Sequence, residues 1–365
     1  MFSQGKKLNK KTKIFVGMSG GVDSSVSAAL LKEQGYDVTG VFIKVWQPDW
    51  IECNWKEERL EAMRAAAHLG IKFMTLDAVK EYKKGVIDYM ISEYEAGRTP
   101  NPDVMCNREV KFGHFAKLAK EMGADYVATG HYAQNIFKAG RHELVASIDE
   151  NKDQSYFLWT LNQKDLSNIM FPVGHLEKPE VRKLAKKFGL PNAYKKDSHG
   201  LCFIGKVDVK EFLKHYIKTE RGNVLNESGN VIGHHPGALL FTIGERHGFT
   251  ITKKGPNDLP YFVVSKNMNE NTITVSNRQN QYSKDDKSKI VHISNTNWVS
   301  GLSPRIDSEL QARTRYRQPL QAIKILNITN DNTIIEFENF QETVTQGQSL
   351  VIYDGEVCLG GGVIC

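Results

Sequence analysis

The stretch of residues 14–31 constrains the fold of this chain more than any other. Residues 14–16 form a short apolar run that predicts a buried strand, and residues 26–31 are largely apolar and predict a helix. Between them lies a glycine-rich turn that includes Gly20 and Gly21. Glycines let backbone N–H groups approach an anion, and the first turn of a helix leaves its N–H groups unpaired. This stretch therefore predicts a phosphate-binding loop.

Two common phosphate-loop patterns do not fit this turn. GxxxxGK[ST], started at Gly17, meets Val22 and Asp23 where it needs Gly and Lys, and GxGxxG meets Ser19 where it needs its second Gly. Residues 19–25 instead read SGGVDSS, which resembles the PP-loop of the ATP pyrophosphatases, enzymes that split ATP between its α and β phosphates. A glycine pair at a tight turn is usually structural, but this long match between a strand and a helix favours ATP binding. The resemblance implies ATP contacts from Gly17, Met18, Ser19, Gly20, Gly21, Val22, Asp23, Ser24 and Ser25.

The composition fits a globular protein of several domains. A chain of 365 residues is long enough for two or three domains, and its 40% hydrophobic content can fill sizeable cores. No stretch is long and apolar enough to span a membrane, and the lysine-rich start lacks the apolar core of a secretory signal, so we expect a cytoplasmic protein. The net charge of +6 is compatible with nucleic-acid binding but does not indicate it.

The cysteine pattern argues against a secreted disulfide framework and against a cysteine-bound metal. The chain has 5 cysteines, an odd and widely spread set that does not fit a secreted disulfide framework. A CxxC pair is absent, and Cys53, Cys358 and Cys365 lack the spacing of metal ligands. We therefore expect no zinc or iron–sulfur site and assign these three cysteines no chemistry.

Strands and helices alternate through the first half of the chain. We predict strands at residues 37–43, 71–76 and 124–129 and helices at residues 56–69 and 79–95. Such alternation is typical of an α/β fold with a doubly wound parallel sheet, in which ligands bind beyond the carboxyl ends of the strands. Ile43, at the end of its strand, is then expected near the adenine, and Gly130 and His131 lie in a further loop on the same edge.

Residues 97–107 contain two prolines and a glycine, and we predict a shaped loop there rather than a helix. This loop delivers Cys106 just before a helix predicted at residues 108–122. A thiol near a helix N-terminus has its thiolate form favoured by the helix dipole. Asp103, three residues earlier, is a candidate general acid or base. Taken alone, Cys106 would be interpreted as a buried structural thiol.

A second cysteine, Cys202, lies in a glycine-flanked loop at residues 196–205. One thiol cannot act both as sulfur carrier and as resolving group, whereas two thiols can do so by forming a disulfide during turnover. Alone, Cys202 too would be taken for a buried thiol. Paired with Cys106 and an ATP-binding loop, it suggests sulfur chemistry.

The character of the chain changes after residue 206. We predict a helix at 209–217 and then short strands at 231–232, 238–243, 261–265 and 272–275. Further strands are predicted at 290–293, 309–316, 322–328, 333–337 and 349–359, a spacing typical of a small β-barrel, an architecture that often binds RNA. The expected domains are 1–206, a central β-rich domain at 207–282, and a C-terminal β-barrel at 283–365.

Residues 313–317 read RTRYR within one of these predicted strands. Because side chains alternate along a strand, the three arginines are expected on one face with Tyr316 on the other. Arginines supply affinity for phosphates and an aromatic ring can stack on a base. The ordinary alternative is a solvated basic edge strand.

Five motifs in order make the chain resemble a known family over nearly its whole length. They are SGGVDSS, GRTPNPDVMCN (97–107), ATGHYA (128–133), KDQSYFL (152–158) and DSHGLCFIG (197–205). This series is similar to that of the tRNA-specific 2-thiouridylases, the MnmA or TrmU family, whose fold begins with an adenine nucleotide α hydrolase-like domain. The departures are conservative, such as Leu201 where isoleucine is common.

The resemblance implies a tRNA-uridine 2-sulfurtransferase that uses ATP and Mg²⁺. ATP would adenylate the C2 oxygen of the wobble uridine in the tRNAs for Lys, Glu and Gln. Cys202 would carry a persulfide sulfur received from a donor protein, and Cys106 would release the product and leave a Cys106–Cys202 disulfide. The order of these last steps stays open.

The resemblance also implies roles for individual residues. Ile43 and Gly130 would touch ATP. Contacts to tRNA would come from Asn101, Pro102, Asp103, His131, Lys152, Asp153, Gln154, Arg315, Tyr316 and Gln348. The plain alternatives are a structural histidine at 131 and an ordinary polar turn at 152–154.

Two other functions compete with this interpretation. A PP-loop ligase or amidotransferase that adenylates a small molecule would need neither Cys106 nor Cys202. An RNA-binding module with a vestigial nucleotide fold would need no intact ATP loop, and the presence of Ser19, Asp23 and Ser24 argues against it.

Overall fold

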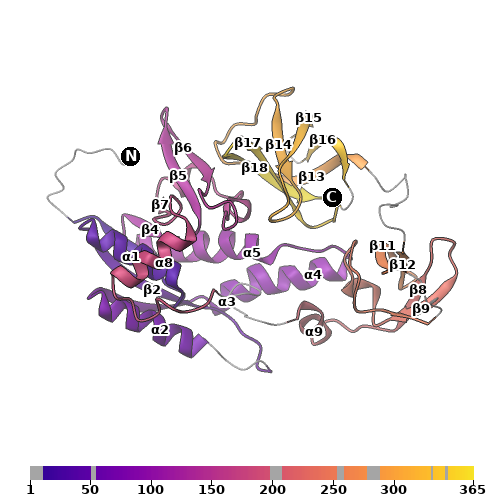
Figure 1. The fold of residues 1–365 in the computed structure, drawn as a ribbon, viewed down its shortest axis with the longest axis horizontal. Coiled ribbons are helices and arrows are strands. Elements are labelled where there is room, and N and C mark those ends of the chain that lie inside the picture. Colours follow the sequence, from indigo (N-terminus) through magenta and orange to yellow (C-terminus); the bar gives the residue numbers. More distant parts are fainter. Residues whose placement is uncertain are drawn as a thin grey trace.

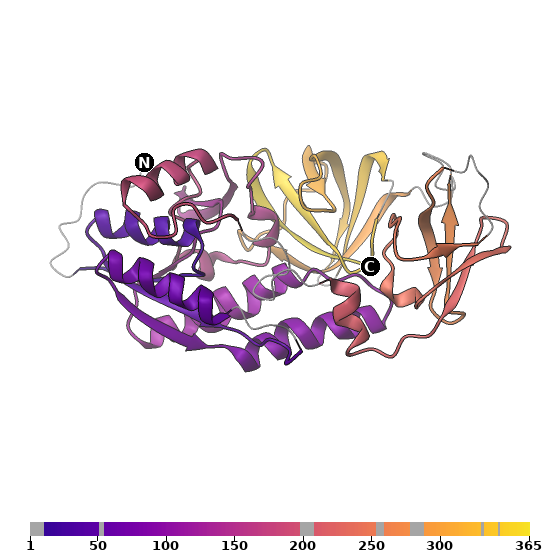
Figure 2. The same ribbon diagram turned by 60° about the horizontal axis from the view of Figure 1, so that its bottom comes forward.

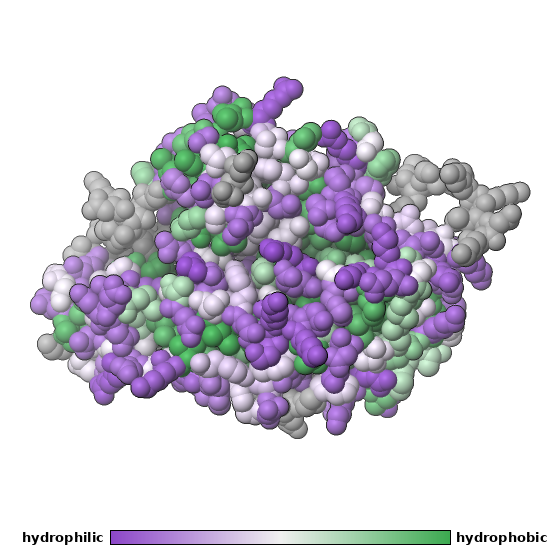
Figure 3. All heavy atoms as spheres, turned by 180° about the vertical axis from the view of Figure 1, so that it is seen from behind, coloured by the Kyte–Doolittle hydropathy of each residue, from purple (hydrophilic) through white to green (hydrophobic). Residues whose placement is uncertain are grey.

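The computed structural model describes residues 11–50, 55–197, 208–252, 259–277, 288–329, 332–341 and 344–365. Two views show an elongated arrangement, with the α/β part at one end, a small β-rich part at the other, and a β-barrel between them (Figures 1 and 2). Within the described part of the chain, no helix is both long and apolar enough to cross a membrane. The rear face carries mostly hydrophilic side chains, with separate hydrophobic patches (Figure 3).

The first half of the chain forms the predicted parallel sheet, in the order β3-β2-β1-β4-β7. Its strands are β1 (Lys13–Gly17), β2 (Asp37–Lys44), β3 (Lys72–Asp77), β4 (Tyr126–Ala128) and β7 (Ile169–Met170), and neighbouring strands are parallel throughout. Strand β7 was not predicted. The doubly wound α/β fold is confirmed.

Helices cover both faces of this sheet. One face packs on α1 (Val22–Glu33), α2 (Trp55–His68) and α8 (Lys178–Lys187). The other packs on a helical run of α3 (Val79–Tyr82), the π-helix η1 (Lys83–Asp88) and α4 (Tyr89–Glu95), and on a second run of α5 (Pro102–Met105), the π-helix η2 (Cys106–Phe115) and α6 (Ala116–Glu121). Because strand side chains alternate, Ile14 and Val16 join the first core and Phe15 joins the second.

The second helical run begins earlier than predicted, which corrects the expectation of a loop up to residue 107. Asn101 is the N-cap, its side-chain oxygen accepts a hydrogen bond from the Val104 N–H at 3.3 Å, and Pro102 occupies the first helical position. Proline is favoured there because its missing N–H is one that a helix start leaves unpaired. Cys106 therefore lies one turn inside the helix, not just before it.

The C-terminal part closes into an antiparallel β-barrel, as predicted. Its order is β13 (Ser288–Trp298), β16 (Asn332–Gln341), β15 (Gln321–Ile328), β14 (Leu310–Arg313), β17 (Ser349–Asp354) and β18 (Val357–Ile364), and β13 pairs with β18 to close it. The run predicted as one strand at 349–359 is a hairpin that turns at Gly355, where φ is +56°.

The predicted strand at 309–316 is too long, and the expected alternation of its arginines is wrong. Strand β14 ends at Arg313, and the chain turns where the Gln318 N–H donates to the Arg315 carbonyl oxygen. Arg317 has a φ of +64°, outside the range of a strand. The three arginines therefore do not share one strand face.

A hairpin that we did not predict joins the first part of the chain to the barrel. Strands β5 (Ala133–Lys138) and β6 (Arg141–Ala146) follow the α/β sheet, and β6 pairs with β18 through Cys358 opposite Leu144. The barrel sheet thus extends into residues 133–146, which lie far before residue 288, where the barrel begins. Two short helices follow, η3 (Ser155–Phe157) and α7 (Gln163–Leu166).

The central part has helix α9 (Val209–Lys214) and a sheet in the order β10-β9-β8-β12-β11. Its strands are β8 (Gly222–Leu225), β9 (Val231–His235), β10 (Thr250–Ile251), β11 (Phe262–Asn267) and β12 (Thr272–Ser276). The strand predicted at 238–243 is wrong. A 3₁₀ turn, η4 (Ala238–Leu240), stands there because the Leu240 N–H bonds back to the carbonyl of Gly237, whose φ is +151°.

Candidate nucleotide and thiol site

The PP-loop, residues 17–25, joins β1 to α1 at the carboxyl end of the sheet. Gly20 has a φ of +79°, and a Cβ there would stand 2.5 Å from the backbone oxygen of Glu58, so only glycine fits. Gly21 is the N-cap of α1 with extended backbone, and among the described residues no side chain caps the start of that helix. The first-turn N–H groups of α1 therefore have no capping side chain in the described part of the chain, and their binding of a phosphate stays a prediction.

Hydrogen bonds within the PP-loop and from Asn192 stabilise its conformation. The Oγ atom of Ser24 accepts from the Ser19 N–H at 3.3 Å, and the Ser25 hydroxyl donates to the Gly21 carbonyl oxygen at 3.0 Å. Asn192 donates from Nδ2 to the Gly20 carbonyl oxygen and to Ser25 Oγ, each at 3.0 Å. Asn192 was not predicted, because it lies far along the chain in no motif.

The loops after β1 and β4 meet, as expected for ligand-binding loops of one sheet edge. A Cβ on Gly130 would stand 2.6 Å from the backbone nitrogen of Ser24, so the two loops are in close backbone contact. The Met18 N–H donates to the Val41 carbonyl oxygen of β2 at 2.8 Å. Ile43 is buried near the end of β2. Contacts of Ile43 and Gly130 with ATP stay predictions.

A charged network that the sequence did not reveal borders the PP-loop. Asp23 accepts hydrogen bonds from Lys178 Nζ at 2.6 Å and from the Tyr132 hydroxyl at 2.8 Å. Lys178 Nζ also lies 2.9 Å from a carboxylate oxygen of Asp197. Asp197 further accepts from Lys152 and from Arg182, each at 2.7 Å. Lys178 and Arg182 lie in no motif, and nothing in the sequence signals that the motif residues meet one another, because these side chains come together only through the fold.

The network shifts two pKa values in opposite senses. Burial alone would raise the pKa of the Asp197 carboxyl, but hydrogen bonds from Lys152 and Lys178 outweigh it and hold that pKa well below its usual range. Burial, and then the neighbouring Asp23 carboxylate, raise the pKa of the Tyr132 phenol. Asp197 is therefore a carboxylate and Tyr132 a neutral hydrogen-bond donor at physiological pH.

Of the two proposed thiols, the structure places one. Cys106 is fully buried in the core cluster that also contains Phe15 and Ile43. The helical segment that begins at Cys106 ends at Phe115, whose ring would lie 3.5 Å from a Cβ on Gly17 of the PP-loop. Cys202 and Cys53 lie outside the described residues. Asp197 is the last described residue before Cys202, and it lies in the charged network beside the PP-loop.

The barrel supports the segment that leads to Cys106. Gln348 donates from Nε2 to the carbonyl oxygens of Thr99 at 2.8 Å and Pro100 at 3.0 Å. The Thr99 N–H in turn donates to the carbonyl oxygen of Gln346 at 2.8 Å. The loop before Asn101 is thus fixed from the barrel side. Asp103 is part-buried within the first turn of the helix that carries Cys106.

The residues of the KDQ motif all have internal partners. Lys152 is paired with Asp197. Asp153 is only 4% exposed, and its carboxylate accepts from the Ser155 hydroxyl at 2.9 Å and lies 3.5 Å from Arg313 Nη2. Gln154 accepts from the Tyr132 N–H at 2.9 Å and so fixes the loop after β4. Their contacts with tRNA stay predictions.

Two predicted tRNA contacts lie where the three parts of the chain meet. Arg315 donates from Nη2 to Thr345 Oγ1 at 3.0 Å and to the Ile243 carbonyl oxygen at 3.3 Å, linking the barrel to the central part. The Tyr316 ring centroid lies 4.5 Å from that of Phe157. Both residues border the first part of the chain, and their tRNA roles too stay predictions.

His131 follows Gly130 in the loop after β4, and its side chain is buried. Its Nδ1 lies 2.7 Å from Thr129 Oγ1, and its Nε2 lies 3.4 Å from Lys111 Nζ. Burial, together with the Lys111 charge, holds the pKa of His131 well below its usual value. The imidazole is therefore neutral, and a contact with tRNA stays a prediction.

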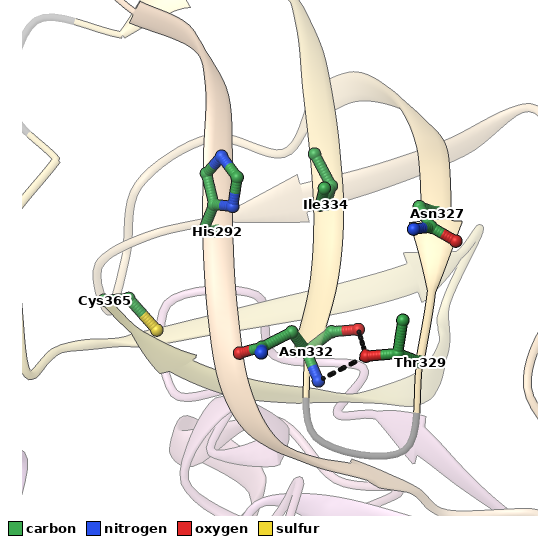
Figure 4. A pocket seen from close by; sticks show the side chains of 6 residues that line it. All are labelled: His292, Asn327, Thr329, Asn332, Ile334 and Cys365. Carbon is green, nitrogen blue, oxygen red and sulfur yellow. Dashed lines mark hydrogen bonds between the residues drawn. The ribbon is translucent and has the colours of Figure 1, made fainter.

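The barrel also carries a pocket of about 480 Å³ (Figure 4). It lies over β13, β15 and β16 and is lined by His292, Asn327, Thr329, Asn332, Ile334 and Cys365. None of the predicted site residues lines it. Among the described residues no group of three His, Cys, Asp or Glu side chains could hold a metal ion.

Comparisons with known proteins agree along the whole chain. Three family profiles match in succession: a tRNA methyl transferase HUP domain at residues 12–206, a tRNA methyl transferase PRC-barrel domain at 210–277 and an aminomethyltransferase beta-barrel domain at 288–364. The tRNA-specific 2-thiouridylase MnmA 2 of Geobacillus kaustophilus is 45% identical over 98% of this chain and 96% of its own length. The tRNA-specific 2-thiouridylase MnmA of Thiobacillus denitrificans is 45% identical over 97% of this chain and 99% of its own.

A solved structure is distantly similar. The U34-tRNA thiolase NcsA of Methanococcus maripaludis matches 54% of this chain and 63% of its own at 19% identity, with a TM-score of 0.37. So low a score carries no argument about site or function.

Proposed function

This chain belongs to the family of tRNA-specific 2-thiouridylases, and on that premise we propose that it is a tRNA-uridine 2-sulfurtransferase. The proposed reaction replaces the C2 oxygen of the wobble uridine with sulfur in the tRNAs for Lys, Glu and Gln, and converts ATP to AMP and pyrophosphate. The observation that carries the proposal is that the helical segment which begins at Cys106 reaches the PP-loop at its other end, where a Cβ on Gly17 would stand 3.5 Å from the Phe115 ring.

The PP-loop has the features that a triphosphate requires. In the part of the chain that the structure describes, no side chain caps the first turn of α1, so its backbone N–H groups can donate to an anion. The positive φ of Gly20 gives the loop the turn that leaves room for that anion. Mg²⁺ is commonly held by one or two carboxylates together with substrate phosphates, and Asp23 is the carboxylate of this loop. When bound there, Mg²⁺ would neutralise charge on the leaving pyrophosphate.

Sulfur transfer follows adenylation in the proposed reaction. A donor protein places a sulfur on Cys202, and the resulting persulfide attacks the uridine C2 carbon as AMP leaves with the former C2 oxygen. The thiolate of Cys106, which has given up its proton, attacks the Cys202 sulfur. The bond between the Cys202 sulfur and the sulfur on uridine C2 breaks, and the latter sulfur stays in 2-thiouridine. A Cys106–Cys202 disulfide remains, which an external thiol reduces. Attack of Cys106 on the persulfide before transfer is the other order.

The proposed RNA contacts lie in the first and last parts of the chain. We propose units of residues 1–206, 207–282 and 283–365, of which the last is the barrel. Contacts with the anticodon region would come from residues 101–103, His131, residues 152–154, Arg315, Tyr316 and Gln348. Because the wobble base is already unpaired in the anticodon loop, extracting it costs little.

Nucleoside mass spectrometry tests this function. Unmodified tRNAs for Lys, Glu and Gln are incubated with the protein, ATP and Mg²⁺, with a cysteine desulfurase and cysteine as the sulfur source. Wild type is expected to form 2-thiouridine, whereas Cys202→Ser and Cys106→Ser form none. Cys365→Ser is the control, because that cysteine is exposed at the barrel pocket.

Each result discriminates between functions. Thiolation by Cys202→Ser at the wild-type rate would remove Cys202 from its role. ATP turnover without any thiolation would favour a PP-loop enzyme that adenylates a small molecule.

A further inference from the structure

Lys178 lies at the PP-loop although nothing in its own sequence neighbourhood points there. It opens α8, and its Nζ reaches Asp23 Oδ1 at 2.6 Å and Asp197 Oδ1 at 2.9 Å. The side chain is only 13% exposed, and Nζ lies 5.7 Å from the centre of the Tyr132 ring. An ammonium group is thus held at the start of α1 by two carboxylates and an aromatic face.

Both carboxylates keep other donors if the Lys178 ammonium moves away. Asp197 retains Lys152 and Arg182, each at 2.7 Å. Asp23 retains the Tyr132 hydroxyl at 2.8 Å. Removing a cation from a part-buried carboxylate is costly when it leaves the charge unpaired. Asp197 would keep two cations, whereas Asp23 would keep only a neutral hydroxyl. The Lys178 ammonium can therefore leave Asp197 at modest cost while it stays paired with Asp23.

The Lys178 ammonium can move only within reach of Asp23, with which it is paired. Asp23 is part of the first turn of α1, whose N–H groups are capped by no side chain that the structure describes. The Gly130 loop closes the other side of that turn, against Ser24. A phosphate on these N–H groups would therefore lie beside the ammonium that Asp23 holds. Lysine is well suited to such a ligand, because a compact point charge pairs with phosphate oxygens without demanding a fixed geometry.

We propose that Lys178 is a further binding residue for the polyphosphate of ATP and for the pyrophosphate that leaves. Its ammonium exchanges the Asp197 carboxylate for a phosphate oxygen when the nucleotide binds, and Asp197 stays paired with Lys152 and Arg182. This inference rests on the proposed function, since it takes the PP-loop to be the ATP site.

Calorimetric titration of the full chain tests the proposal with three ligands in the presence of Mg²⁺: ATP, pyrophosphate and adenosine. Lys178→Ala and Lys178→Gln are expected to weaken ATP and pyrophosphate binding by about ten- to a hundredfold, the range for a lost hydrogen bond to a charged group. Adenosine binding is expected to stay unchanged, and Lys178→Arg to recover most of the loss. Lys187→Ala is the matched control, because it removes a lysine of the same helix whose ion pair with Glu33, at 3.5 Å, lies at the surface.

The outcomes separate this inference from the function beneath it. Equal ATP affinity in wild type and both Lys178 variants would overturn the role of Lys178 and leave the nucleotide site standing. A loss of adenosine binding as large as that of ATP would also overturn it, because the residue would then only support the fold of the site. Failure of wild type to bind ATP would instead overturn the proposed function.

Discussion

The buried imidazole of His131 makes the stability of the chain depend on pH. Its pKa lies well below the ordinary value of 6.5 because of burial, with the Lys111 charge adding to the effect. Below pH 6.5 the unfolded chain binds a proton that the folded chain does not, so the folded state loses stability as the pH falls. Above that pH both states are neutral at this residue, and the dependence vanishes.

We therefore expect the free energy of unfolding to fall by about 1.4 kcal/mol for each pH unit below the ordinary pKa because of this one group. Urea unfolding of wild type and His131→Gln, from neutral pH to about two units lower, measures it. The variant should show a shallower slope by that amount. Identical slopes would mean that the imidazole titrates normally in the folded chain.

At the scale of elements, sequence patterns predicted those strands, helices and turns whose formation depends on residues close together in the sequence. The alternation of apolar strands and helices fixed the parallel sheet, and SGGVDSS marked the turn from β1 into α1. The start of α5 also has a local signal, Asn101 followed by Pro102, but prolines are equally common in loops and the loop prediction there is wrong. The β5–β6 hairpin had no such signal, because its outer partner is β18 from the far end of the chain.

The turn between β1 and α1 offers a matched test of its glycine. Gly20→Ala adds a Cβ that meets the Glu58 backbone oxygen at 2.5 Å, on top of the strain of a positive φ. Gly35→Ala, after α1, imposes a similar φ of +89° with nothing within 4 Å. Both changes should cost about 1 kcal/mol of stability from strain, but only Gly20→Ala should also abolish ATP binding.

Thermal unfolding and ATP titration of the two variants check this expectation. Normal ATP binding by Gly20→Ala would show that the loop shape seen here is not the one that binds the nucleotide.

At the scale of the whole molecule, contacts between distant segments decide the site, and these could not be predicted. Gln348 of the barrel fixes Thr99, and Lys178 reaches Asp23 across more than a hundred residues. Such pairs follow no spacing rule, since only the folded arrangement brings them together. The order of a sheet domain, a β-rich part and a barrel was predictable because each has its own local pattern.

The ion pair between Asp153 and Arg313 is a junction of this kind, joining the first part of the chain to the barrel. Asp153 is 4% exposed, and the Arg313 guanidinium stacks 4.8 Å from the centre of the Tyr353 ring. Arg313→Ala leaves a buried carboxylate without its cation and should cost about 3 kcal/mol. Lys83→Ala, which breaks a half-exposed pair with Asp88, should cost at most about 1 kcal/mol.

Chemical denaturation of both variants gives the comparison. Losses of the same size would mean that the Asp153–Arg313 pair contributes no more than a surface contact does.

The central claim is that the C2 oxygen of the wobble uridine leaves as part of AMP, and its fate can be followed directly. An anticodon stem-loop that carries ¹⁸O at that oxygen is thiolated with the wild-type protein, and the AMP is analysed by mass spectrometry. The account predicts one heavy oxygen in each AMP formed with a 2-thiouridine. Thiolated product together with AMP that contains no heavy oxygen would contradict adenylation of the base. The PP-loop would then not bind ATP for that step.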